Sequence, residues 1–203
     1  MATELEIKYA VGDIQLLDCI LCDRDIRERM TEYFRYIRME TTYYDTQSGA
    51  LAEKKQALRL RKEDERSVIT FKTAGEGYAR GEWEVEGEYL DEAADVLCAQ
   101  GAPQELKEVM EQGVIPMCGA KFTRIEAKLS LDDGCRCVLS GDIGELFAEG
   151  KSEPLCEMEF ELTSGEEEQM LAFARMIAER YHLNEEAKSK FARARALKVG
   201  GEV

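Results

Sequence analysis

The chain has 203 residues, 34% of which are charged, and its formal net charge is −15. A chain of this length can bury a core as one unit, so we expect a single domain over residues 1–203. The acidic balance argues against nucleic acid or an anionic membrane as a partner, but it permits a small anionic ligand where Lys and Arg concentrate locally.

The cysteine and histidine content indicates a reducing compartment and argues against several kinds of metal site. The seven cysteines are an odd number, no stretch approaches the roughly 20 apolar residues that span a bilayer, and no signal-peptide pattern precedes the first strand. We therefore expect a cytoplasmic protein with reduced thiols. Cys19 and Cys22 form a CxxC pair without a second pair at zinc-site spacing, and the one histidine, His182, argues against a histidine-based zinc site or a Ser-His triad.

The first strand is expected at residues 2–9, where charged and apolar side chains alternate. On a strand this alternation places Glu4, Glu6 and Lys8 on one face and the intervening apolar residues on the other. Two carboxylates can hold a hard divalent cation, and the lysine can hold the anion that the cation carries. A half-solvated strand of an antiparallel sheet shows the same alternation, so this segment alone leaves both interpretations open.

The remaining elements follow from hydrophobic periodicity and from turn residues. In chain order they are a helix at 13–30, strands at 33–46, 56–62, 67–73 and 79–88, helical residues at 90–112 with a break near Pro103, strands at 121–131, 135–146 and 154–163, a helix at 165–183, and a last helical stretch carrying Lys188, Lys190, Arg193 and Arg195. Turns are expected at 47–49 and 74–77. Most strand connections are short, so we expect mainly antiparallel pairing.

Most of these strands have one apolar face and one densely charged face, which indicates a closed barrel. If the charged faces point inward, the apolar faces meet helices outside, and about eight strands leave room for side chains or one small ligand. We therefore predict an α+β fold, an eight-stranded antiparallel β-barrel with helices packed outside. Charges of both signs in such an interior must neutralise one another or bind ions, which favours a metal–polyphosphate complex as ligand.

Several motifs occur in a fixed order along essentially the whole chain. They are Glu4-x-Glu6-x-Lys8, Tyr43-Tyr44-Asp45-Thr46, Leu58-Arg59-Leu60-Arg61, Thr70-Phe71-Lys72, Arg80-x-Glu82-x-Glu84, Arg124, Asp142-x-Gly144, Glu157-x-Glu159-x-Glu161 and Ser189-Lys190. This ordered set resembles that of the CYTH family, the triphosphate tunnel metalloenzymes. The resemblance implies an eight-stranded antiparallel β-tunnel and divalent-metal-dependent chemistry on triphosphates.

The resemblance also implies roles for individual residues. Catalytic roles are implied for Glu4, Glu6, Lys8, Arg59, Arg61, Lys72 and Glu159. Phosphate binding is implied for Lys8, Arg59, Arg61, Lys72, Arg80, Arg124 and Lys190, and arginine forks suit bidentate phosphate contacts. Coordination of Mg²⁺ or Mn²⁺ is implied for Glu4, Glu6, Asp142, Glu157 and Glu159, with Glu161 nearby. We expect a monomer or homodimer.

The natural substrate is less sharply indicated. Residues 153–162 resemble a segment of bacterial inorganic triphosphatases, so we expect hydrolysis of tripolyphosphate to pyrophosphate and phosphate. A class IV adenylate cyclase, which forms cyclic AMP and pyrophosphate from ATP, and a thiamine triphosphatase remain alternatives. A non-catalytic module that binds polyphosphate or nucleotide is a further alternative, although such a module has no need of the acids that the resemblance assigns to metal binding.

Overall fold

The structure is a computed structural model that describes residues 2–75 and 78–199, so Glu76 and Gly77 of the expected turn at 74–77 lie outside the described residues. Eight strands pair antiparallel, and pairing of the fifth with the first closes them into a barrel. They are β1 (Ala2–Ala10), β2 (Arg35–Asp45), β3 (Ala57–Glu63), β4 (Arg66–Lys72), β5 (Ala79–Glu86), β6 (Ile115–Ser130), β7 (Arg136–Ala148) and β8 (Lys151–Ser164). The predicted α+β barrel is therefore confirmed.

The order of strands around the barrel is β5-β4-β3-β2-β6-β7-β8-β1, and the short β9 (Asn184–Glu185) adds to β1. The helices of the described part are α1 (Ile14–Leu21), α2 (Arg24–Arg29), α3 (Ala50–Glu53), α4 (Leu90–Ala99), α5 (Glu105–Glu111), α6 (Glu167–Arg180) and α7 (Lys190–Val199). None of these helices is both long and apolar enough to cross a membrane.

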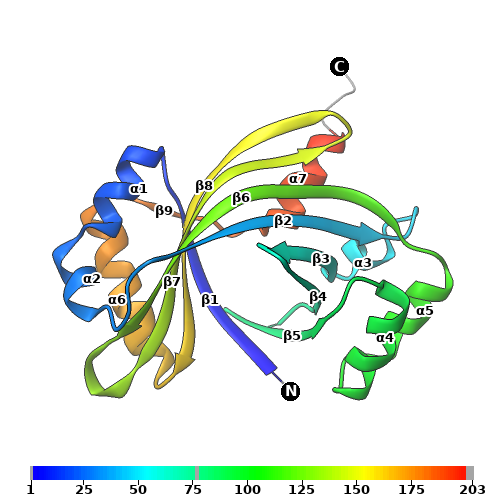
Figure 1. Cartoon of the computed structure of the whole chain (residues 1–203), viewed down its shortest axis with the longest axis horizontal. Helices are drawn as coiled ribbons and strands as arrows, with labels where there is room; N and C mark the ends of the chain where they lie inside the picture. Colours follow the sequence, from blue (N-terminus) through cyan, green and yellow to red (C-terminus); the bar gives the residue numbers. More distant parts are fainter. Residues whose placement is uncertain (1, 76–77, 200–203) are drawn as a thin grey trace.

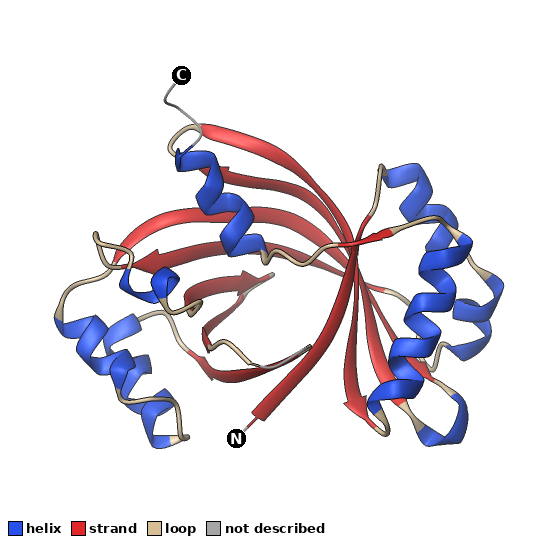
Figure 2. Cartoon of the chain, turned by 180° about the vertical axis from the view of Figure 1, so that it is seen from behind, coloured by secondary structure: helices blue, strands red, loops and turns tan. Residues whose placement is uncertain are grey.

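Two groups of helices cover the outside of the barrel, whereas α7 lies against the inner face of the long strands and lines the cavity. Figures 1 and 2 show α1, α2 and α6 together at one end of the long strands, α4 and α5 at the other end, and α7 alongside β6 and β8. Under the first group, Phe160 of β8 is fully buried and meets Phe173 of α6 edge-on at 5.9 Å between ring centroids. Burial of one such side chain stabilises the fold by about 1.5–3 kcal/mol. Trp83 of β5 likewise packs outward against Leu97 of α4.

The expected helix at 13–30 is two helices. The backbone N–H of Cys22 closes α1, and the Asp23 side chain accepts a hydrogen bond from the N–H of Asp25 and so caps α2. Arg180 of α6 then pairs with the same Asp23 carboxylate at 2.7 Å, which ties this break to the neighbouring helix. An aspartate inside an apolar-periodic segment therefore marks a second helix start here.

Several strands are longer than expected. The strand predicted to begin at 121 begins at Ile115, and the two strands predicted to end at 146 and begin at 154 continue to a two-residue turn at Glu149 and Gly150. Both turn residues have positive φ, 48° and 78°, which matches the right-handed twist of the flanking strands. The tight turn lets β7 and β8 pair over their full length, and the long hairpin carries Asp142 and Glu157 side by side.

Helix α3 directly follows the expected turn at 47–49, and the sequence pattern did not predict it. The buried Asp45 carboxylate accepts hydrogen bonds from the backbone N–H groups of Thr46, Leu51 and Ala52. Gly49 begins α3 with a φ of 83°, a left-handed conformation that glycine adopts without strain. The aspartate of the Tyr43-Tyr44-Asp45-Thr46 motif therefore fixes local backbone and does not face the barrel interior.

Candidate active site

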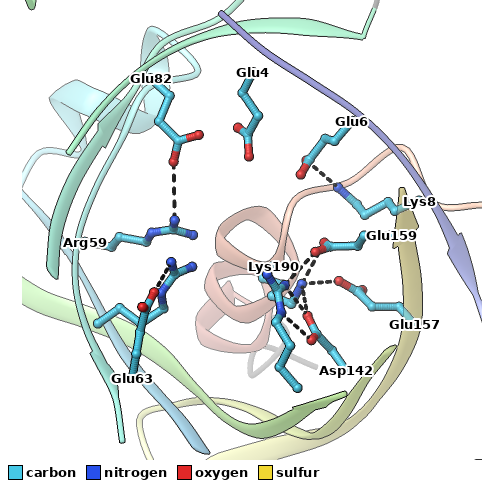
Figure 3. A network of polar contacts seen from close by, with 12 residues as sticks. Glu4, Glu6, Lys8, Arg59, Glu63, Glu82, Asp142, Glu157, Glu159 and Lys190 are labelled. Atoms are coloured by element: carbon cyan, nitrogen blue, oxygen red, sulfur yellow. Dashed lines mark hydrogen bonds and ion pairs between the residues drawn. The ribbon is translucent and has the colours of Figure 1, made fainter. Parts of the chain in front are cut away.

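Charged side chains from most of the strands and from α7 line a cavity of about 800 Å³ inside the barrel. Of the residues predicted from sequence, the structure brings together along this cavity Glu4, Glu6, Lys8, Arg59, Arg61, Lys72, Arg80, Arg124, Glu159 and Lys190. Figure 3 shows Glu6 and Lys8 across the opening from Arg59, and Glu4 beside Glu82. The barrel interior is therefore a tunnel lined by both positively and negatively charged side chains, as the alternation of charged and apolar residues in the sequence predicts.

In one wall of the cavity, formed by β3, β4 and β5, cationic side chains form ion pairs with carboxylates. Nζ of Lys72 lies 2.5 Å from Oε2 of Glu4 and 3.1 Å from Oε1 of Glu82. Arg59 Nη2 lies 3.4 Å from Oε1 of Glu82, and Arg61 forms a short ion pair with Glu63. The Nε groups of Arg59 and Arg61 are buried without a hydrogen-bond acceptor among the described residues. Both guanidinium groups line the cavity, where their outer nitrogens can meet an anion.

A second group of charges lies where β6, β7 and β8 meet α7. Arg124 donates to both oxygens of Asp142 at 2.8 and 2.7 Å and to Oε2 of Glu159 at 2.6 Å. Oxygens of Asp142, Glu157 and Glu159 lie within 4.8 Å of one another, a spacing that could hold a cation. The Lys190 ammonium lies among them, 2.8 Å from Asp142 and 2.8 Å from Glu159 and in close contact with Glu157 (Figure 3).

Between these two groups of charges, an acidic residue of β1 lies opposite an acidic residue of β8. Glu6 lies directly opposite Glu161 in the β1–β8 register, and both line the cavity. Glu6 has Arg80 at 3.6 Å and Lys8 at 3.7 Å, whereas no Lys or Arg nitrogen of the described residues lies within 4.0 Å of Glu161. Burial and the nearby Glu4 carboxylate raise the pKa of Glu161 to about 7. An acid cluster that is short of cations has the donor chemistry for a hard divalent ion.

The carboxylates near Lys72 share a proton. Burial and the Glu4 carboxylate raise the pKa of Glu82, while Lys72, together with a hydrogen bond between the two carboxyl groups, keeps the pKa of Glu4 low in spite of burial. The pair therefore carries one proton at neutral pH, held on Glu82. Proton exchange with a ligand in the cavity is available at this wall.

A family model described as the CYTH domain matches residues 2–194. The chain belongs to the CYTH family. The family named from the ordered motifs is thereby confirmed. CYTH proteins bind triphosphate substrates and depend on divalent metal ions, and in this chain Glu161 of β8 lines the cavity without a Lys or Arg nitrogen of the described residues within 4.0 Å.

Solved structures at low sequence identity share this CYTH fold. A protein of Pyrococcus horikoshii aligns with a TM-score of 0.60 at 19% identity, covering 97% of this chain and 99% of its own. A candidate adenylyl cyclase from Hippeastrum, described as having a dominant triphosphatase activity, aligns with a TM-score of 0.57 at 18% identity, covering 97% and 96%. A candidate adenylate cyclase from Bacillus halodurans aligns with a TM-score of 0.58 at 15% identity, covering 93% and 96%. These likenesses show the fold.

The structure also identifies residues of the CYTH tunnel that sequence reasoning missed. Glu63 pairs with Arg61, and Arg193 lies 2.6 Å from Glu157, although Arg193 was expected only as part of the last helix. The sequence spacing could have identified both residues. Glu63 is two residues from Arg61 on a strand, and Arg193 is three residues from Lys190 on a helix, so each lies on the same face as a predicted site residue. Lys55 and Arg195 line one mouth of the cavity, and nothing in the sequence pattern marks them.

Proposed function

We propose that the protein hydrolyses inorganic tripolyphosphate to pyrophosphate and phosphate inside the tunnel, with Mg²⁺ or Mn²⁺. The observation that carries this proposal is the arrangement of the cavity: cations of β1, β3, β4 and β6 line it together with carboxylates of β1 and β8, and one of these carboxylates, Glu161, has no Lys or Arg nitrogen of the described residues within 4.0 Å. A ligand that suits both sides carries several negative charges together with a divalent ion. A triphosphate–metal complex has this composition.

The chain's own residues account for substrate binding. The guanidinium groups of Arg59 and Arg61 and the ammonium group of Lys72 can donate to phosphate oxygens from one wall. Lys8 and Arg124 can donate from the other side of the same cavity. Because arginine forks are planar and rigid, they select oxygens held at fixed spacing, as those of a phosphate group are.

Glu4, Glu6, Glu159 and Glu161 are the residues that would hold the metal ion, because all four line the cavity on β1 and β8. When bound, a divalent ion neutralises phosphate charge and lowers the pKa of a coordinated water.

Transition-state stabilisation falls mainly to the cations. In phosphoryl transfer, negative charge is spread over the equatorial oxygens of the transferred group and over the leaving oxygen, and fixed guanidinium and ammonium groups stabilise it without reorganising. The single histidine lies outside the tunnel, so the proton of the attacking water must go to a carboxylate. We assign this step to a cavity-lining carboxylate that does not ligate the metal.

The experiment is a product assay with tripolyphosphate, ATP and thiamine triphosphate, each with Mg²⁺, with Mn²⁺ and with chelator, resolved by ³¹P NMR. We expect pyrophosphate and phosphate from tripolyphosphate, with turnover abolished by chelator. Cyclic AMP from ATP would establish the class IV adenylate cyclase instead, and preferred cleavage of thiamine triphosphate would establish that activity. Tight tripolyphosphate binding without turnover of any substrate would indicate a binding module.

A further inference from the structure

Lys190 is the first residue of α7, and its ammonium group lies inside a cage of three carboxylates, Asp142, Glu157 and Glu159, here called the lysine cage. Asp142 and Glu157 are fully buried, with 0% exposure each. Lys190 and Glu159 line the cavity, whereas Asp142 and Glu157 lie behind them. The two fully buried acids therefore meet the cavity through the cations that they hold, Lys190 for both and Arg124 for Asp142.

The charges of the lysine cage are already balanced by the chain. Three carboxylates face three cations: Lys190 at the centre, Arg124 on Asp142 and Glu159, and Arg193 on Glu157. A divalent ion between the carboxylates would have to displace the Lys190 ammonium. Because removing one partner from a buried ion pair leaves an uncompensated charge, that displacement is costly.

The cage also sets where α7 lies. The side chain of Ser189 accepts a hydrogen bond from the N–H of Ala192 and so caps the helix, while Phe191 packs on Tyr43 at 5.1 Å between ring centroids. Lys190 and Arg193 then anchor the same turn to β7 and β8. The first turn of α7 is thereby held against the tunnel from two directions, and the Lys190 ammonium is fixed at the cavity surface.

We propose that Asp142 and Glu157 are positioning residues, which hold Lys190 and the first turn of α7 at the tunnel wall, and that they do not ligate the metal. This departs from the metal-binding role that the family resemblance implies for these two acids. It rests on the proposed function in one respect, since the anion that Lys190 meets is taken to be a triphosphate. The metal ligands are then confined to the acids of β1 and β8 that line the cavity.

The first test measures Mn²⁺ binding by electron paramagnetic resonance, without substrate, so that an inactive protein is still informative. Asp142→Asn and Glu157→Gln are compared with wild type, with Glu6→Gln as a variant of the proposed metal wall. The matched control is Glu145→Gln, an exposed residue of the same strand as Asp142 on its other face. We expect the Kd for Mn²⁺ to stay within about twofold of wild type in Asp142→Asn and Glu157→Gln and to weaken in Glu6→Gln.

The second test is a double-mutant cycle on tripolyphosphate binding, measured by calorimetry with EDTA present so that nothing turns over. The cycle is run in an Arg124→Ala background, which removes the other cation that Asp142 holds. If Asp142 acts through Lys190, then Asp142→Asn weakens binding about tenfold in this background and has no further effect once Lys190→Ala is added, since coupled residues are not additive. Lys190→Arg is expected to recover part of the affinity lost in Lys190→Ala. The Glu145→Gln control is expected to bind as wild type does.

The proposal is overturned if a folded Asp142→Asn or Glu157→Gln protein loses Mn²⁺ affinity tenfold or more, or if the Asp142 and Lys190 effects on tripolyphosphate binding are additive. Folding is checked by near-ultraviolet circular dichroism, and Asp142→Asn alone suffices if Glu157→Gln does not fold. These outcomes are separate from failure of the proposed function, which would appear as wild-type protein that binds tripolyphosphate without cleaving it.

Discussion

At the residue level, the tunnel separates carboxylates that are matched by a cation from one that is not. Glu159, although buried, has its pKa held well below its usual range by Lys190 and Arg124. Glu161, two residues along the same strand face, has no cation of the described residues within 4.0 Å, and burial raises its pKa to about 7. Strand parity alone predicts both residues inside the barrel, but only their neighbours decide which one carries a proton.

This difference predicts the pH dependence of stability. Glu161 takes up a proton in the folded state below about pH 7 and in the unfolded state only below its ordinary pKa of 4.5. Between these values the native state binds more protons, so its contribution to stability is fully present below about pH 4.5 and is lost as the pH rises through 7. Glutamine mimics the protonated acid, so Glu161→Gln should equal wild type at pH 5 and exceed it at pH 8 by on the order of 2 kcal/mol.

Urea unfolding at the two pH values, with EDTA present, measures this effect. The comparison between variant and wild type cancels contributions from the other carboxylates of the tunnel. Equal stability of the two proteins at pH 8 would mean that Glu161 is ionised in the folded state and that its charge is compensated there. The conclusion that Glu161 lacks a cation partner would then be rejected.

At the level of elements, the close approach of β6 and β7 depends on glycine. A Cβ atom on Gly144 would lie 2.0 Å from the backbone oxygen of Lys121 and 2.5 Å from Cα of Phe122. Backbone atoms cannot yield as a flexible side chain can, so the two strands would have to separate. The Asp142-x-Gly144 motif therefore combines an acid of the lysine cage with a glycine that permits strand pairing.

Gly144→Ala is expected to lower the free energy of unfolding by about 3 kcal/mol, because overpacking here moves backbone. Gly12→Ala is the control, since no atom lies within 4 Å of its added Cβ, and it should change stability by less than about 0.5 kcal/mol. Chemical denaturation of both variants tests this. A Gly144→Ala protein as stable as the Gly12→Ala control would show that β6 and β7 lie farther apart than the structure places them.

Helices and strands could be predicted from the sequence where the hydrophobic periodicity was strong. They could be predicted less well where a single side chain determines where a helix begins or ends. The strand of Glu4 and Glu6 and the break near Pro103 agree with the structure. The split between α1 and α2 does not follow from periodicity, because it depends on the capping bond from Asp23 and on its pairing with Arg180, 157 residues away. Helix α3 was missed because its main stabilisation is the buried Asp45 carboxylate, which a sequence pattern does not distinguish from a turn residue.

For the whole molecule, closure of the barrel is what turns alternating strands into a site. Pairing of β5 with β1 places Glu4 opposite Arg80, and pairing of β1 with β8 places Lys8 opposite Glu159. The inward direction of these charges could be predicted, since burying the apolar faces against helices leaves no other arrangement. Which of these charges pair with each other could not be predicted, because the pairing depends on the register between strands that lie up to about 150 residues apart in the sequence.

The most direct test of the account is the steady-state rate of phosphate release from tripolyphosphate with Mg²⁺, for wild type and for Arg61→Ala. Arg61 lines the cavity, where its guanidinium group can meet an anion. The account predicts that wild type cleaves tripolyphosphate in preference to ATP and that Arg61→Ala, still folded, loses kcat/KM by about 10²-fold, the usual effect of removing one such donor. Equal rates for the two proteins, or no release by wild type, would contradict a catalytic triphosphate tunnel.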